Sequence, residues 1–216
     1  MVKIVLVDDH QDTLENLSRK IPTEIQGTQI FAVGNCDAAY YFIQQHPDLK
    51  LLIVDLTIQN ASKFTLKQGK DLLRQLKKDQ LSIPTIIYTD HHDLETIFPI
   101  IDNYEPMGFV LKNNFGNEDL FHAIKKVLRG EPHYVHKVNM QLKVRTKFEY
   151  KIDSTDEKII NHLPHIEHNK DWESTNIGLS ERAVRNRLER LRSDFAVDNN
   201  VQLLLKLQRL GFLNLE

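Results

Sequence analysis

The sequence has little of what marks exported or membrane-spanning proteins. Among its 216 residues there is one cysteine, Cys36, which excludes a disulfide within the chain and suits a reducing compartment. No apolar stretch approaches the roughly 18 residues that a membrane-spanning helix needs, and the first apolar run ends at Asp8, unlike a signal peptide. We therefore expect a cytoplasmic protein that does not enter a membrane.

The composition also lacks an excess of one charge. The 28 Lys and Arg residues are balanced by 30 Asp and Glu, which gives a formal net charge of -2. Such a balance provides no general attraction to nucleic acid, so any binding of this kind must come from a local basic patch. The length fits one large or two modest domains, and the hydrophobic fraction of 41% is that of a globular protein.

Short apolar runs alternate with helical patterns over residues 1–129. Five such runs occur, at residues 3–7, 29–33, 51–54, 84–88 and 107–111. A short, unbroken apolar run is typical of a strand that is buried on both faces of a parallel sheet. Because strands and helices alternate at this spacing, the sequence predicts an α/β fold with a five-stranded, doubly wound parallel sheet.

Polar residues follow four of these runs at the point where each predicted strand ends. They are Asp8 and Asp9, Asp55, Thr89, and Lys112. Right-handed crossovers bring the carboxyl ends of parallel strands to one edge, and open α/β sheets bind their ligands at that edge. Chance explains each polar residue separately but not the whole set. We therefore expect a functional site at this edge.

These residue types suit phosphoryl transfer. Crowded carboxylates repel one another, and a magnesium ion, which prefers oxygen ligands, relieves the repulsion. One carboxylate is then left as a nucleophile, since carboxylates can form aspartyl-phosphates. Lys112 supplies a positive charge and Thr89 a hydroxyl donor for the phosphoryl oxygens. A magnesium-dependent phosphatase for external substrates would share this pocket, but a second acid–base residue is not evident.

The polar residues of the predicted edge lie in four motifs: Val7-Asp8-Asp9, Val54-Asp55, Tyr88-Thr89 and Val110-Leu111-Lys112. In this combination they make residues 1–129 resemble the receiver domain of two-component response regulators, and Asp8-Asp9-His10 resembles the NarL/LuxR type. The resemblance implies a flavodoxin-like, non-enzymatic domain in which a sensor histidine kinase phosphorylates Asp55, assisted by Thr89 and Lys112. It also implies Mg²⁺ held by Asp9, Asp55 and the Thr57 carbonyl, with Asp8 acting mostly through water.

The same resemblance implies a switch. In the family, activation moves the threonine towards the phosphate and buries an aromatic residue three positions before the lysine; here these residues are Thr89 and Phe109. Thr57 and His91 stand where the family tunes the lifetime of the phosphate, and we treat that role as a hypothesis. The loop of residues 57–68 is longer than is usual in the family.

Residues 130–152 are predicted to connect two domains. Apolar and polar residues alternate from position 138 to position 152, and a period of two indicates an extended strand. One face of this strand would be apolar and the other mostly cationic. Two interpretations stay open: a strand or hairpin that docks between the domains or pairs across a dimer, and a solvated tether.

Residues 153–216 are predicted to form a small all-α domain. Ser180 is a suitable N-cap, and the helix after it has an apolar stripe of Val184, Leu188, Leu191 and Phe195. Five residues beside or opposite this stripe suit contacts in a DNA major groove: Arg182, Arg185, Asn186, Arg187 and Arg190. With its Leu179-Ser180-Glu181 start, the segment resembles the helix-turn-helix output domain of NarL/LuxR-type regulators.

The two domains together predict a phosphorylation-controlled transcription regulator that binds double-stranded DNA as a homodimer. One observation favours an alternative. Residues 153–216 hold nine Lys or Arg against eleven Asp or Glu, which is not the basic domain expected of a DNA-binding protein. The last domain could therefore bind a protein partner instead of DNA. Salt dependence separates the two, because DNA binding weakens steeply as salt rises.

Overall fold

The chain forms two compact units. The computed structural model describes residues 1–58, 64–91, 94–112, 117–135, 138, 151–165 and 178–213. One unit consists of Met1–His92 and Ile100–His136, and the other of Asp93–Pro99 and Lys137–Glu216. Most of the predicted connector lies outside the described residues, so both interpretations of it stay predictions, as do the domain boundaries at residues 129 and 152.

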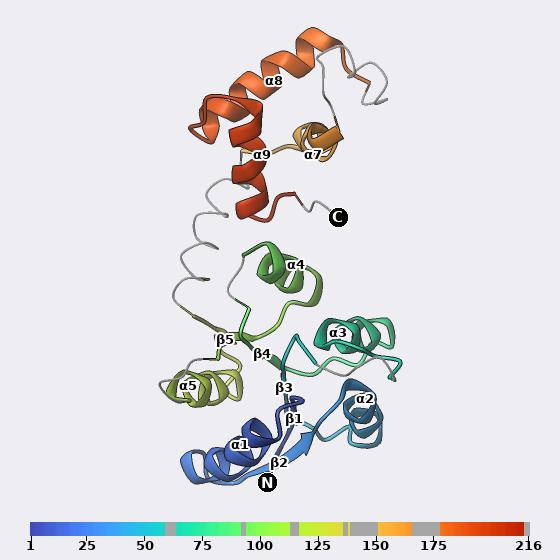
Figure 1. Cartoon of the computed structure of the whole chain (residues 1–216), viewed down its shortest axis with the longest axis vertical. Helices are drawn as coiled ribbons and strands as arrows, with labels where there is room; N and C mark the ends of the chain where they lie inside the picture. The colour runs from blue at the N-terminus through green and yellow to red at the C-terminus, as the bar shows by residue number, and fades with distance from the viewer. Residues whose placement is uncertain are drawn as a thin grey trace. The chain divides into compact units, whose positions relative to one another are not determined.

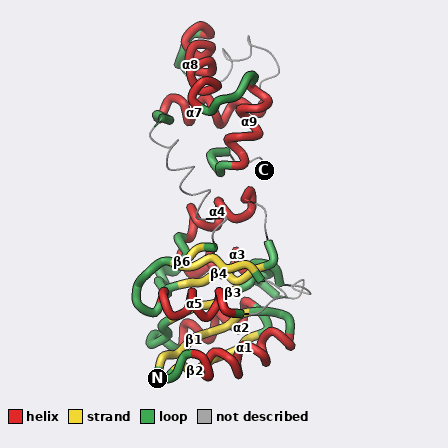
Figure 2. Tube along the Cα trace, turned by 90° about the vertical axis from the view of Figure 1, so that its left-hand side faces the viewer, coloured by secondary structure: helices red, strands yellow, loops and turns green. Residues whose placement is uncertain are grey.

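The first unit is built on a parallel sheet with the strand order β2-β1-β3-β4-β5-β6 (Figure 2). Its strands are β1 (Val2–Val7), β2 (Thr28–Val33), β3 (Leu51–Val54), β4 (Thr85–Thr89), β5 (Gly108–Leu111) and β6 (His133–Tyr134). Its helices are α1 (Gln11–Glu24), α2 (Cys36–Gln45), α3 (Gly69–Lys78) and α5 (Glu118–Val127), together with the part of α4 (Leu94–Tyr104) that begins at Ile100. Helices α1 and α5 lie on one face of the sheet and α2 and α3 on the other (Figure 1), so the predicted doubly wound α/β fold is confirmed.

The predicted number of five strands is wrong by one. The sixth strand, β6, has two residues and pairs with β5 in parallel. The backbone amide of His133 donates to the Met107 carbonyl at 2.9 Å, and that of Val135 donates to the Phe109 carbonyl at 3.0 Å. A pairing this short carries no alternation that periodicity could detect. It places the first residues of the predicted connector in the sheet.

The core on the α1 and α5 face fixes the central strands. Side chains from β1, β3, β4 and β5 pack there against helix residues that include Leu14, Leu17 and Ile21 of α1 and Leu120 and Ile124 of α5. Each Leu or Ile that is fully buried in this way contributes about 1.5–3 kcal/mol. All four residues of β3 and all five of β4 are buried, as expected for central parallel strands.

The second unit is helical in its described part. It contains α7 (Ser154–His162), a short 3-10 turn (Leu163–His165), α8 (Glu181–Asp194) and α9 (Asn200–Arg209). Side chains cap all three helices: Asp153 caps α7, Ser180 caps α8 as predicted, and Asn199 caps α9. The predicted stripe of α8 is confirmed, because its residues lie in one core with Ile159 and Ile160 of α7 and Leu203 and Leu207 of α9.

Two further points concern predicted features of this chain. The resembled helix-turn-helix would place its first helix around residues 171–176, which lie outside the described residues. Among the helices that are described, none combines the length and the apolar character needed to cross a membrane.

Candidate functional site

Loops at the carboxyl ends of β1, β3 and β5 bring three predicted site residues into contact. The Lys112 Nζ atom lies 2.5 Å from Asp55 Oδ2 and 2.8 Å from Asp8 Oδ2. The parallel register explains the meeting, because Val7 of β1 pairs with Val54 of β3 and both strands end there. The expected gathering of these side chains at one edge of the sheet is therefore observed.

The contact between Lys112 and the two carboxylates is nearly closed to solvent. The side chains of Asp8, Asp55 and Lys112 are 1%, 5% and 12% exposed. Burial by itself lowers the pKa of Lys112, but its hydrogen bonds to Asp55 and Asp8 outweigh burial and hold that pKa above its ordinary value. The lysine therefore stays a cation at neutral pH.

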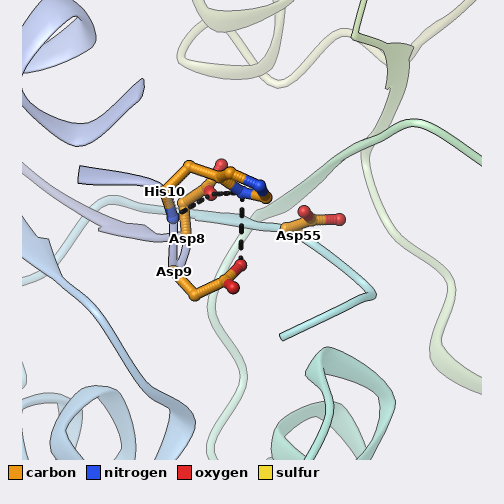
Figure 3. A group of neighbouring side chains, drawn as sticks. All are labelled: Asp8, Asp9, His10 and Asp55. Atoms are coloured by element: carbon orange, nitrogen blue, oxygen red, sulfur yellow. Dashed lines mark hydrogen bonds and ion pairs between the residues drawn. The ribbon is translucent and has the colours of Figure 1, made fainter. Parts of the chain in front are cut away.

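A histidine belongs to this site in addition to the predicted residues. The Nδ1 atom of His10 lies 3.1 Å from Asp8 Oδ1 and 3.3 Å from Asp9 Oδ1, and dashed lines in Figure 3 mark these interactions. The backbone amide of His10 also donates to Asp8 Oδ1 at 2.9 Å. The prediction from sequence left His10 out of the site. The available signal was its position directly after Asp9.

Four side chains thus offer donor atoms to one point in space. One atom from each of Asp8, Asp9, His10 and Asp55 lies within 4.8 Å of the others. Among the described residues, three carboxyl groups gather beside the ammonium group of Lys112, so acidic groups outnumber the lysine there. A divalent cation would balance this excess, and carboxylates are ligands that Mg²⁺ accepts. The residues present therefore fit the predicted ion.

Thr89 and Phe109 are both completely buried, at 0% exposure. Thr89 is the last residue of β4, and its Oγ1 accepts a hydrogen bond of 3.4 Å from the backbone amide of His91. Phe109 lies in β5, next to the short strand β6. Their roles in a switch stay predictions.

Thr57 contacts residues at the ends of two neighbouring strands, β3 and β4. Its backbone amide donates to Asp55 Oδ1 at 3.2 Å, so both oxygens of the Asp55 carboxylate are engaged. Its hydroxyl lies 2.7 Å from the Nε2 atom of His91, which follows β4. The two residues that the resemblance associates with phosphate lifetime therefore touch one another beside Asp55.

The long loop after β3 is closed at its base by Gln68. The side-chain amide of Gln68 accepts from the Ile58 backbone amide at 2.9 Å and donates to the Ile58 carbonyl at 3.4 Å. The next residue, Gly69, packs against the Asp55 backbone, since a Cβ atom there would lie 2.0 Å from the Asp55 carbonyl oxygen. Only glycine fits this approach without a backbone shift.

In the second unit, acidic residues of α7 hold two of the predicted DNA-contacting arginines. Arg187 Nη1 lies 2.7 Å from Asp153 Oδ2 and 2.8 Å from Asp156 Oδ1, and Arg190 also pairs with Asp156. Asp156 is 0% exposed. The hydrogen bond from Arg187 lowers the pKa of Asp153 to about 2. Arg187 and Arg190 therefore hold α8 against the start of α7.

The remaining predicted contacts on α8 are differently placed. Arg182 and Asn186 are exposed, and Arg185 is paired with Glu181 one turn earlier, at 2.6 Å. A pair of this kind on a helix surface contributes only about 0.3–0.5 kcal/mol, so Arg185 can exchange its partner at little cost. DNA contact by all five residues stays a prediction.

Comparison with known proteins agrees with the geometry of the edge. The family model described as "Response regulator receiver domain" matches residues 4–125. This match covers more than half of the chain, and the chain therefore belongs to the family of response regulators that carry this receiver domain.

Individual relatives are more distant. The glycerol metabolism activator of Pseudomonas putida is 26% identical over 130 residues, which are 60% of this chain and 55% of that protein, so the match spans about half of its length. A LuxR-family two-component response regulator from Aurantimonas sp. SI85-9A1 has a TM-score of 0.55 at 21% identity, over 65% of this chain and 94% of that one. The RcsB response regulator of Salmonella typhimurium has a TM-score of 0.66 at 17% identity, over 96% and 99% of the two chains. The likeness to RcsB extends the shared fold over both units.

Proposed function

We propose that the chain is a transcription regulator in which phosphorylation of Asp55 by a sensor histidine kinase controls binding to double-stranded DNA. The observation that carries this proposal is the contact of Lys112 with both Asp55 and Asp8 at an edge where carboxylates exceed cations. Membership of the receiver family supports it.

The chemistry assigns one role to each group. A carboxylate oxygen of Asp55 attacks the phosphorus atom of the donor phosphohistidine, and the bond from phosphorus to the histidine nitrogen breaks. Lys112, already within hydrogen-bond distance of Asp55, moves its charge to the new phosphoryl oxygens, and Thr89 donates a hydroxyl hydrogen bond to them. This charge assistance lowers the barrier because phosphoryl transfer depends mainly on positioning and on neutralised oxygens.

Magnesium belongs to the same proposal. Asp9, Asp55 and the Thr57 carbonyl would bind the ion directly, and Asp8 mostly through water. When bound, the ion supplies positive charge that neutralises the phosphoryl oxygens and the crowded carboxylates. Asp8 keeps Lys112 in place, since it contacts the ammonium group that also bonds to Asp55 Oδ2.

The proposed binding to DNA depends on α8 and α9. Helix α8 is capped by Ser180 and exposes Arg182 and Asn186, side chains that read guanine and adenine edges in a major groove. Helix α9 exposes two apolar residues one turn apart, Val201 at 67% and Leu205 at 46%. We assign these to pairing between two copies on DNA. The RcsB protein, whose fold this chain shares over both units, interacts with DNA.

A second candidate function is binding of a protein partner by the helical unit. The pairing of Arg187 and Arg190 with Asp153 and Asp156 favours it, because it removes two cations from the positive charge available to phosphate groups.

A DNA-binding selection on the full chain, with and without beryllofluoride as a phosphate mimic, tests the proposal. The expected result is enrichment of related sequences that is stronger with beryllofluoride, is lost in Asp55→Asn and weakens steeply with salt. Enrichment of no sequence under either condition would favour the protein partner.

A further inference from the structure

The position of His10 gives the acidic pocket a donor that the proposed function does not use. Its Nδ1 atom faces one oxygen of Asp8 at 3.1 Å and one of Asp9 at 3.3 Å. Figure 3 shows that all three side chains leave the short segment after β1, with Asp55 on the neighbouring strand end. All four residues offer atoms within 4.8 Å of one another.

These distances match the spacing of neighbouring ligands around one metal ion. Donors at about 2.1 Å from an ion are about 3.0 Å apart in an octahedral site and about 3.4 Å apart in a tetrahedral one. The two distances from His10 Nδ1, 3.1 Å and 3.3 Å, fall between these values. One ion can therefore reach the imidazole and both carboxylates with little rearrangement, and in this arrangement Asp8 would bind the ion directly and not mostly through water.

Hydrogen bonding explains the same arrangement less well. A ring nitrogen carries at most one hydrogen, yet His10 Nδ1 faces two carboxylates. Both distances are also longer than the roughly 2.7–2.9 Å of a good charge-assisted N–H···O bond. As a hydrogen-bond donor, Nδ1 can bond to one carboxylate at a time, and at a long distance. As a metal ligand, it can bind an ion that both carboxylates also bind.

Lys112 does not occupy the position that this ion needs. The lysine contacts Oδ2 of Asp8, while His10 faces Oδ1 of the same carboxylate. The His10 side chain is 52% exposed, so an ion can arrive from solvent along the imidazole. The lysine and the histidine beside Asp8 thus lie at different oxygens.

We propose that His10 is a metal ligand and that the pocket consequently prefers a first-row transition-metal dication, such as Mn²⁺ or Co²⁺, over Mg²⁺. The inference rests on the metal site of the proposed function and adds a nitrogen donor to it. Imidazole is a good ligand for transition ions, whereas Mg²⁺ takes oxygen ligands and keeps its waters. His10 therefore strengthens transition-metal binding and adds little for Mg²⁺.

Calorimetric titration of the full chain with Co²⁺ and with Mg²⁺ tests the preference. We expect His10→Asn to weaken Co²⁺ binding at the pocket by about tenfold or more, in line with the effect of losing a group that supports a metal site. Binding of Mg²⁺ should change by less than about twofold, because asparagine retains an oxygen donor. His46→Asn is the matched control, since the His46 ring bonds to the Phe42 carbonyl at the end of α2 and should not affect either ion.

Pulsed electron paramagnetic resonance of the Mn²⁺ form supplies a second readout that stability does not affect. Nitrogen coupling from an imidazole is expected in the wild type and should disappear in His10→Asn. Equal Co²⁺ affinity in both proteins, or no nitrogen coupling in the wild type, would overturn the inference. Formation of an Asp55 phosphoryl adduct in Mg²⁺ is measured in parallel. If the adduct forms while His10→Asn has no effect, only the role of His10 is wrong; if neither the adduct nor metal binding is seen, the proposed function fails as well.

Discussion

Two clusters bury an aspartate against cationic side chains but differ in charge balance. We call them the receiver edge, formed by Asp8, Asp9, Asp55 and Lys112, and the α7–α8 contact, formed by Asp153, Asp156, Arg187 and Arg190. At the receiver edge, Lys112 contacts Asp8 and Asp55, and the His10 ring lies beside Asp8 and Asp9, so among the described residues three carboxyl groups gather around one lysine. At the α7–α8 contact, two carboxylates meet two guanidinium groups. A balanced cluster is complete by itself and fixes two helices, whereas an unbalanced one needs a further cation. Charge balance therefore separates a binding site from a structural contact more reliably than burial does.

The largest effect is expected when the Lys112 cation of the receiver edge is removed. Lys112→Met should slow phosphorylation of Asp55 by about 10²–10³-fold, which is the usual loss when one preorganised charged donor is deleted. The rate of adduct formation with acetyl phosphate, followed by intact-protein mass spectrometry, measures this. Lys125→Met, on the exposed side of α5, is the control. A rate within threefold of the wild type, on the order of 0.7 kcal/mol, would show that Lys112 has no part in the transfer.

A change in the α7–α8 contact should instead lower the stability of the helical unit. Asp156→Asn leaves Arg187 and Arg190 without their shared buried carboxylate, and we expect the free energy of unfolding of the helical unit to fall by about 3 kcal/mol. Urea unfolding followed by circular dichroism measures the change. Glu157→Gln, at the exposed neighbouring position, should have almost no effect. Equal stability of the two variants would contradict a structural role for Asp156.

The α8 surface allows the two kinds of arginine to be compared directly. Arg182→Ala should weaken DNA binding by about 1–3 kcal/mol and leave stability unchanged, because its side chain is exposed. Arg187→Ala should lower stability, because it breaks the pairs with Asp153 and Asp156. Fluorescence anisotropy with the selected DNA, together with urea unfolding, measures both properties. If Arg187→Ala instead weakened DNA binding and left stability unchanged, Arg187 would be a DNA-contacting residue.

The smallest effect concerns acid pH. The pKa of Asp153 is lowered to about 2 in the folded chain by the hydrogen bond from Arg187. The unfolded chain therefore binds this proton first as pH falls, so the stabilisation from Asp153 is present above its ordinary pKa and is lost as pH falls towards 2. We expect a shallower loss of stability between about pH 4 and pH 2 in Asp153→Asn, which unfolding curves at a series of pH values would detect. Parallel curves for both proteins would speak against the ion pair.

Much of the fold and of the receiver edge follows from sequence, because apolar strands end abruptly in polar residues and parallel topology brings those ends together. What the sequence could not show depends on contacts between distant segments. A helical wheel of α8 places Arg187 and Arg190 outside the apolar stripe, but their partner Asp156 on α7 lies 31 and 34 residues earlier. The two residues of β6 are too few for a periodic signal. The sequence likewise does not show that His10, the N-cap residue of α1, makes no side-chain cap and contacts Asp8 of the acidic pocket instead.

The acceptor role of Asp55 is tested most directly by locating a phosphoryl group on the full chain after incubation with acetyl phosphate and Mg²⁺. Peptide mass spectrometry should find one phosphoryl group on the peptide that contains Asp55 and none on that peptide in Asp55→Asn. An unmodified Asp55 peptide in the wild type, under conditions in which Mg²⁺ is shown to bind, would contradict the account.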